Sequence, residues 1–143
     1  MEKPASYFEG VLQFRGCSDE VLDWAHDEIM RAGRARIAKV KEVKGGIDVY
    51  LSSQHYMQSL GRKLQQRFGG ILKVTSKIHT RDPVRSKDVH RLTVLFRQLP
   101  FKKGSVVKYK GEQWKVLATG SQVLMQNVSS GKKIRLRAEK LIR

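Results

Sequence analysis

The chain has 143 residues, with 29 Lys and Arg against 13 Asp and Glu, and a formal net charge of +16. Its 40% hydrophobic content excludes a disordered basic tail, and no apolar run reaches the ~18 residues of a membrane span. The first seven residues lack the apolar stretch of a secretory signal, and the single cysteine, Cys17, excludes an internal disulfide. We therefore expect a cytoplasmic protein whose first candidate partner is a polyanion.

The positive charge is confined to one part of the chain. Residues 1–61 hold eight Lys and Arg and nine Asp and Glu, whereas residues 62–143 hold twenty-one and four. A charge excess of this size repels itself in a folded protein. Its segregation indicates a surface for nucleic acid in preference to a solvated basic face of no consequence.

The first predicted elements are a strand and a helix. Residues 7–15 alternate apolar and polar side chains, which predicts a half-buried strand with Phe8 and Phe14 on its inner side. Apolar residues then recur at helical spacing between Ser18, a candidate N-cap, and Gly33.

A hairpin and a second helix follow. Residues 37–44 and 47–51 favour β-structure and flank the glycine pair at 45–46, which suits a tight turn. Ser53 is expected to cap a second helix, which the glycine pair at 69–70 ends.

Two longer strands are predicted at 71–80 and 89–98, with a loop over 81–88 that contains Pro83. The first six elements match the order of the ferredoxin-like split βαβ plait, and the last strand is expected to extend that sheet as a hairpin. The fold class is therefore α+β, with a ferredoxin-like domain over residues 1–99.

Beyond Leu99 the helical period disappears, and short β-rich runs alternate with glycines. This pattern predicts a small β-barrel of SH3-like or OB-like type over residues 100–143, with Trp114 in its core. So short a segment is close to the ~40-residue limit for independent folding, so we expect it to pack against the first domain. Its strands are expected at 106–110, 113–119, 123–128 and 134–137.

Motifs for catalysis or metal binding are missing from the sequence. His79 and Asp82 are close enough in sequence to be an acid–base pair. The more common explanation of such a pair is a histidine at the end of a strand beside an aspartate in a turn, with no catalytic role. Cys17 is better explained as a packing residue than as a nucleophile. The histidines have no metal-ligand spacing. We therefore expect no enzyme activity, no metal, no cofactor and no small-molecule substrate.

Basic residues form two candidate RNA-binding groups. One lies on the hairpin predicted from the strands at 71–80 and 89–98, and the other alternates with apolar residues along the last strand. A charged edge strand also resists aggregation, whereas a loop has no structural need for clustered cations, so the hairpin tip is the stronger candidate. Few aromatics accompany these residues, which favours phosphate contacts over base stacking. The predicted RNA-binding residues are Lys77, Arg81, Arg85, Lys87, Arg91, Lys132, Lys133, Arg135 and Arg137.

Several sequence runs resemble a known family. Residues 7–15 (YFEGVLQFR), 46–53 (GIDVYLSS) and 76–82 (SKIHTRD) are similar to the middle region of the nonsense-mediated-decay-three family, the ribosomal export adapters. The run at 106–111 (VVKYKG) resembles that family's small barrel, which is akin to translation factor five-A. Family members usually begin with a zinc-binding region of paired CxxC motifs. Because Cys17 is the only cysteine in this sequence, the chain resembles an archaeal-type or shortened homologue, or a fragment.

The resemblance implies a non-enzymatic factor that binds the large ribosomal subunit and its rRNA, with no membrane partner. Two alternatives stay open. One is a general nucleic-acid-binding factor of transcription-elongation type, which would use the barrel. The other is an RNA-processing enzyme on a ferredoxin-like scaffold, which would need His79 or His90.

Overall fold

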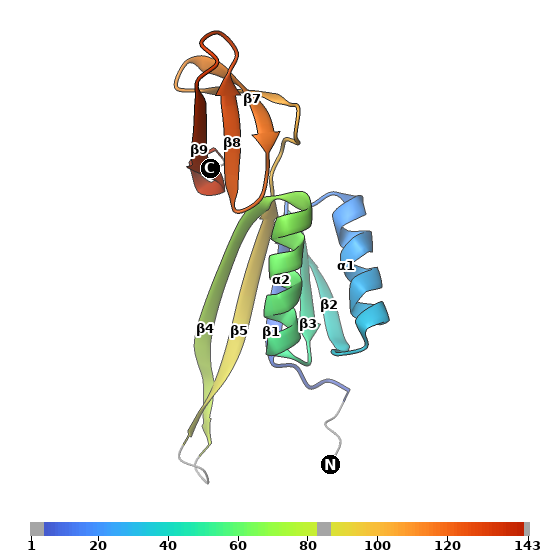
Figure 1. The fold of residues 1–143 in the computed structure, drawn as a ribbon. Helices are drawn as coiled ribbons and strands as arrows, with labels where there is room; N and C mark the ends of the chain where they lie inside the picture. The colour runs from blue at the N-terminus through green and yellow to red at the C-terminus, as the bar shows by residue number, and fades with distance from the viewer. Residues whose placement is uncertain (1–4, 83–86, 142–143) are drawn as a thin grey trace.

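The computed structural model of the protein describes residues 5–82 and 87–141, and it describes the side chains of those residues outside 77–90. A five-stranded sheet with two helices on one face is followed by a separate four-stranded sheet (Figure 1). The elements in chain order are β1 (Gly10–Arg15), α1 (Asp19–Ala32), β2 (Ile37–Val43), β3 (Gly46–Leu51), α2 (Gln54–Phe68), β4 (Gly70–Asp82), β5 (Lys87–Gln98), β6 (Val106–Tyr109), β7 (Glu112–Ala118), β8 (Gln122–Asn127), β9 (Lys133–Arg137) and a short 3-10 helix, η1 (Ala138–Lys140).

Both helices begin and end where the sequence predicts. The Ser18 hydroxyl accepts a hydrogen bond from the backbone N–H of Val21, and α1 ends at Gly33 in the left-handed conformation. Ser53 caps α2 in the same way, through the N–H of Tyr56 at 3.2 Å. These bonds satisfy backbone donors that a helix start leaves without an intrahelical partner.

The predicted hairpin of β2 and β3 is confirmed, with its turn one residue earlier than the glycine pair suggests. Lys44 and Gly45 form the turn, and Gly45 has a φ of 81°. Gly46 belongs to β3, where an added Cβ would lie 1.8 Å from the carbonyl oxygen of Phe14. The first glycine is thus required by the turn and the second by close approach to β1.

The strand order differs from the ferredoxin-like expectation. The sheet runs β2-β3-β1-β5-β4, so β3 lies between β1 and β2 as the split βαβ unit requires. However, β5 pairs in parallel with β1, and β4 takes the edge position. The expectation that the last strand extends the sheet outward is therefore wrong.

The apolar content of the two strands explains this order. On β5, Val94 and Phe96 are fully buried and Leu92 is 7% exposed. On β4, Val74 is 48% exposed, although it has the same inward parity. The inner position of a sheet buries more apolar surface than the edge, so the strand with the larger apolar face occupies it.

The helices cover only one face of this sheet. The main hydrophobic core joins α1 and α2 to inward side chains of β1, β3 and β5, among them Leu12, Phe14 and Leu51. The β4–β5 hairpin extends past the ends of the helices (Figure 1). Its strands are longer than predicted, since β4 runs to Asp82 and β5 starts at Lys87; Pro83 lies outside the described residues.

The C-terminal part is an antiparallel sheet in the order β6-β7-β8-β9, and its four predicted strands are confirmed within two residues at each end. Trp114 is 5% exposed and donates its indole N–H to the carbonyl oxygen of Tyr109 at 3.3 Å. The predicted core position of Trp114 is confirmed. In the described pairing β6 and β9 are the two edges of an open sheet, so the small SH3-like or OB-like barrel that the sequence predicts stays a prediction.

The two parts pack against each other, as expected. Ile71 at the start of β4 and Leu99 after β5 belong to the same buried cluster as Trp114. The N–H of Gly70 donates to the carbonyl oxygen of Gly120 at 3.4 Å. Gly69 has a φ of 77°, and a Cβ there would lie 2.8 Å from Thr119, so only glycine fits this junction.

We expect Trp114→Ala to lower the free energy of unfolding by about 3–5 kcal/mol, because it empties the centre of the second core. Urea denaturation of the whole chain measures this change. Val106→Ala on the same sheet is the control, since Val106 is 57% exposed and its truncation should change stability by no more than about 0.5 kcal/mol. Equal effects of the two substitutions would contradict the core assignment.

Candidate nucleic-acid interface

The outer face of the C-terminal sheet is strongly basic. Side chains alternate along each strand, so those opposite in parity to Trp114, Val116, Val123 and Met125 point away from the core. The only acidic residues beyond position 99 are Glu112, which shares the parity of Trp114, and Glu139 in η1. The exposed basic residues of this face are Lys108, Lys115, Lys133, Arg135 and Arg137.

The registers place these cations as a grid. Lys115 pairs with Gln126 on β8, and Gln126 pairs with Lys133 on β9, so a polar row crosses three strands. Along β9, Lys133, Arg135 and Arg137 lie about 6.6 Å apart at a ~3.3 Å rise per residue. We call the five exposed cations of this sheet the outer basic face.

A structured turn holds the start of the β9 row in place. The Asn127 side chain is buried, and its Oδ1 accepts from the backbone N–H groups of Ser129 and Ser130, each at 2.9 Å. The N–H of Asn127 donates to the carbonyl oxygen of Lys132 at 2.7 Å. Lys132 is exposed at the end of this turn, next to Lys133. Lys132 thus directly precedes the three outward cations of β9, Lys133, Arg135 and Arg137, and RNA binding by these four residues stays a prediction.

The other predicted group is not beside them. The β4–β5 register pairs Lys77 with Arg91 and Arg81 with Asp88, and Lys87 begins β5. Their backbone positions run toward the hairpin end that lies farthest from the C-terminal sheet (Figure 1). The 13 residues of β4 span roughly 40 Å, so the two groups are separate surfaces. The side chains of Lys77, Arg81 and Lys87, and all of Arg85, lie outside the described residues.

The Arg91 side chain is partly enclosed by the protein, unlike an arginine that is freely exposed for phosphate binding. Its guanidinium carbon lies 4.3 Å from the centre of the Phe8 ring. Nε and Nη1 are buried and have no hydrogen-bond partner among the residues that the structure describes. Phe8 itself lies on the sheet face away from the helices, which corrects its predicted inner position. The reason is that β1 begins at Gly10, so the strand alternation does not extend back to Phe8.

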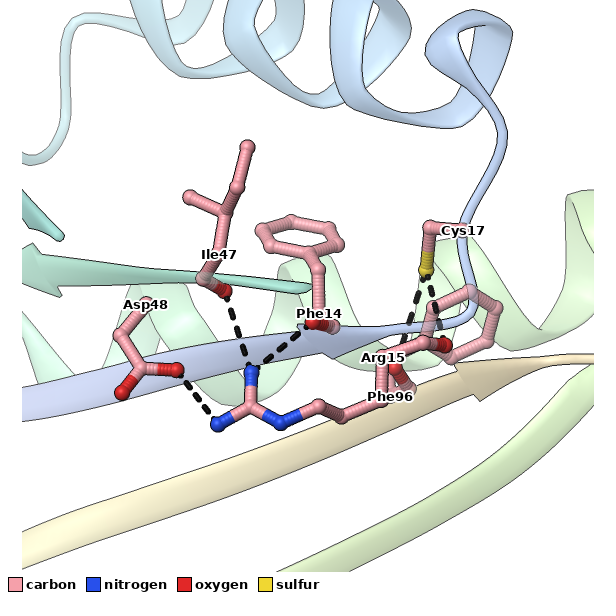
Figure 2. Close-up of polar contacts among 6 residues, drawn as sticks. All are labelled: Phe14, Arg15, Cys17, Ile47, Asp48 and Phe96. Carbon is pink, nitrogen blue, oxygen red and sulfur yellow. Dashed lines mark hydrogen bonds and ion pairs between the residues drawn. The ribbon is translucent and has the colours of Figure 1, made fainter. Parts of the chain in front are cut away.

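A buried ion pair sits on the same open face of the five-stranded sheet (Figure 2). Arg15 Nη2 lies 2.7 Å from Asp48 Oδ1, and its Nη1 donates to the carbonyl oxygen of Phe14 at 2.9 Å. Both side chains are less than one-fifth exposed. Asp48 is the only acidic residue among the described side chains on this face of β1 to β5, and Arg15 neutralises it. Arg15 is therefore occupied by the fold.

The candidates for nucleophilic or metal chemistry are the thiol of Cys17 and clusters of metal-ligating side chains. Burial raises the pKa of Cys17, whose thiol lies against the carbonyl oxygens of Arg15 and Phe96, so it is a protonated packing residue (Figure 2). The described residues hold no cluster of His, Cys, Asp and Glu that could bind a metal. The side chains of His79, Asp82 and His90 lie outside the description, so the acid–base interpretation of the first two stays untested.

Five acidic side chains lie on α1 in the helix layer. Asp19, Glu20, Asp23 and Asp27 are exposed on α1. Glu28 is paired with Arg31 and, at 3.7 Å, with Lys63 of α2, and the hydrogen bond from Arg31 is the main cause that lowers the pKa of Glu28. These five carboxylates of α1 thus lie on a different part of the molecule from the outer basic face.

The comparison with family models bears on this arrangement. Residues 7–97 match the model described as NMD3, second domain, which is more than half of the chain. The chain belongs to the NMD3 family. The match covers the five-stranded sheet with its helices and long hairpin, and it ends before the four-stranded sheet. A search of curated proteins found no match.

Neither of the helices in the described part of this NMD3-family chain is long and apolar enough to cross a membrane.

Sequence reasoning missed two features of the molecule that the structure shows. These are the contribution of Lys108 and Lys115 to the outer basic face, and the contact between the half-buried rings of Phe8 and Tyr50 on the open sheet face. The alternation of β6 and β7 about Trp114 contains the signal for the two lysines.

We expect Arg15→Gln to lower the free energy of unfolding by about 1–3 kcal/mol, because it leaves the Asp48 carboxylate without its cation. Arg97→Gln is the matched control, because it removes the same charge from the register partner of Arg15 on β5. The Arg97 side chain forms no hydrogen bond or ion pair with the described residues. Urea denaturation compares the two. An equal loss from both variants would contradict a structural role specific to Arg15.

Proposed function

We propose that this protein is a non-enzymatic RNA-binding factor that associates with the large ribosomal subunit through its rRNA. Membership of the NMD3 family supports the ribosomal partner. The observation that carries RNA binding is the outer basic face, whose five exposed cations form no ion pair among the described residues. Such a surface repels itself in the free protein and is stabilised when phosphates approach it.

The geometry favours phosphate contacts over base reading on this sheet. Lys and Arg side chains on a flat face reach backbone phosphates and release condensed counterions, which supplies sequence-independent affinity. The ~6.6 Å spacing along β9 is close to the phosphate repeat of a nucleic-acid strand. Folded rRNA presents closely packed phosphates of this kind, and we propose shape-directed binding to it.

The finer fold assignment and location are also proposals. We propose that the four-stranded sheet with η1 is a partly open relative of SH3-like small barrels, since its meander wraps one side of Trp114. A cytoplasmic location is supported by the single thiol of Cys17, which suits a reducing compartment.

Two alternatives can be separated from this proposal by experiment. A general nucleic-acid factor would bind duplex DNA as tightly as purified large subunits at equal phosphate concentration. An RNA-processing enzyme would show turnover of rRNA that is lost in His79→Ala or His90→Ala. A non-enzymatic factor predicts preference for the subunit and no turnover in the wild type.

Binding to large-subunit RNA should depend steeply on salt. If about six phosphates are engaged, a plot of the logarithm of the association constant against the logarithm of the salt concentration should have a slope between roughly −4 and −5.5, at ~0.7–0.9 per contact. Titration of fluorescent rRNA fragments at several salt concentrations measures this slope. A slope near zero would remove the electrostatic basis of the proposal.

Charge reversals should locate the contact surface. Lys133→Glu with Arg135→Glu is expected to weaken subunit binding at fixed salt. Arg81→Glu with Arg85→Glu is expected to weaken it more, because we expect the long hairpin to enter spaces between RNA helices that a flat sheet cannot enter. Arg34→Glu with Arg62→Glu changes the charge equally on the helix layer, where both residues are exposed, and serves as the control.

Subunit titration with a thermal melt of each variant decides the outcome. Losses in the first two variants with little change in the control support a contact surface. Equal losses in all three would show a nonspecific charge effect. A larger loss from the β9 pair than from the hairpin pair would make the C-terminal sheet the main site.

A further inference from the structure

The open face of the five-stranded sheet carries a row of alternating cations and aromatic rings. The Lys39 ammonium on β2 lies 5.4 Å from the centre of the Tyr50 ring on β3. The Tyr50 ring meets the ring of Phe8 edge to face, with centroids 5.0 Å apart. The Arg91 guanidinium on β5 lies over Phe8. We call these four residues the cation–aromatic row.

We propose that this row binds unpaired RNA nucleotides, with a base stacked on Tyr50 and phosphates held by the cations around it. This inference rests on the proposed RNA binding, but it places a second site of different chemistry on a different sheet. The outer basic face contacts phosphates, whereas this row would contact bases.

Charge complementarity identifies the occupant. Besides Arg15, which is paired with Asp48, the described side chains of this face include five cations and no further carboxylate. The charge of this face therefore favours a polyanion over an apolar partner that carries no acidic groups. The five cations are Lys39, Lys41, Lys73, Arg91 and Arg97.

The aromatic rings favour single strands over duplexes. Bases within a duplex are already stacked on their neighbours, so a ring on a sheet surface has no base face to meet. Unpaired bases stack on aromatic side chains whatever their sequence, because each base has a π-face. Phe8 and Tyr50 would contribute nothing to a contact made with duplex phosphates alone.

The row has one fixed end and one movable end. Lys39 is exposed on the edge strand β2, so its ammonium can leave the Tyr50 ring for a phosphate while a base takes its place. Arg91 lies over the Phe8 ring, and its Nε and Nη1 are buried, so it has less freedom to move than Lys39. The positive charge of Arg91 favours an anion on this face, and a nucleotide phosphate supplies one.

The test compares a fluorescent 12-nucleotide oligouridine with an RNA duplex of 12 base pairs, both titrated with the whole chain at one salt concentration. Tyr50→Leu should weaken oligouridine binding at least about fivefold and change duplex binding by less than twofold. Tyr50→Phe keeps the ring and should retain the wild-type affinity. Thermal melts show whether each variant is folded.

Two controls separate this site from the outer basic face. Arg91→Gln should weaken oligouridine binding more than Arg67→Gln, which removes an equal charge and a similar cation–aromatic contact with Trp24 on the helix layer. Lys133→Gln with Arg135→Gln should weaken oligouridine and duplex alike. If this last variant binds both RNAs as tightly as the wild type, the outer basic face is not the RNA-binding surface that we propose. The comparison of the Tyr50 variants would still test the cation–aromatic row.

Photo-crosslinking gives a direct measure of contact. An oligouridine containing 5-iodouridine should crosslink to the peptide that contains Tyr50. Crosslinks confined to the Lys133–Arg137 strand, or unchanged oligouridine affinity in folded Tyr50→Leu, would overturn the inference and assign the row a purely structural role.

Discussion

The arrangement of the molecule depends on the burial of one strand, β5. Its inward side chains Leu92, Val94 and Phe96 lie under the helices, between β1 and β4, and this forces β4 to the edge. The same strand continues past the helices into the long hairpin at one end. At its other end it leads to Leu99, which enters the second core. Hydrophobic burial of one face thus sets the positions of both candidate RNA-binding groups.

Electrostatics then decides which surfaces can meet a polyanion. A net charge of +16 destabilises any compact state unless like charges are kept apart or paired. The fold pairs Arg15 with Asp48 and Arg31 with Glu28, and it presents the acids of α1 on the helix layer. Ten further described cations lie on the outer basic face and on the open sheet face, where they form no ion pair among the described residues.

Local signals in the sequence predict local structure well. Ser18 and Ser53 start helices at the predicted positions, and alternation about Trp114 places it in the second core. The order of β4 and β5 could not be predicted, because both alternations are compatible with a central strand. The difference arises from tertiary packing, which leaves Val74 exposed and buries Val94 opposite it.

The candidate site was predictable to the extent that it follows strand parity. The β9 cations alternate with Ile134 and Leu136, both of which pack on the second core, so their outward direction is visible in the sequence. The cation–aromatic row was not predictable. It joins Phe8, Tyr50 and Arg91, which lie far apart in sequence and meet only because β1 lies between β3 and β5.

The separation of the basic surfaces has its own physical consequence. The β4–β5 hairpin and the C-terminal sheet lie at opposite ends of the molecule, and the packing of Ile71 and Leu99 into the second core connects them (Figure 1). Once one end is held on a large RNA, the other binds as an intramolecular event with a high effective concentration. Modest affinity at each end then multiplies, provided that the RNA presents phosphates at the matching distance. Under the proposed RNA binding, a large folded RNA would meet that condition and a short helix would not, so selectivity would come from the distance between surfaces that individually read no sequence.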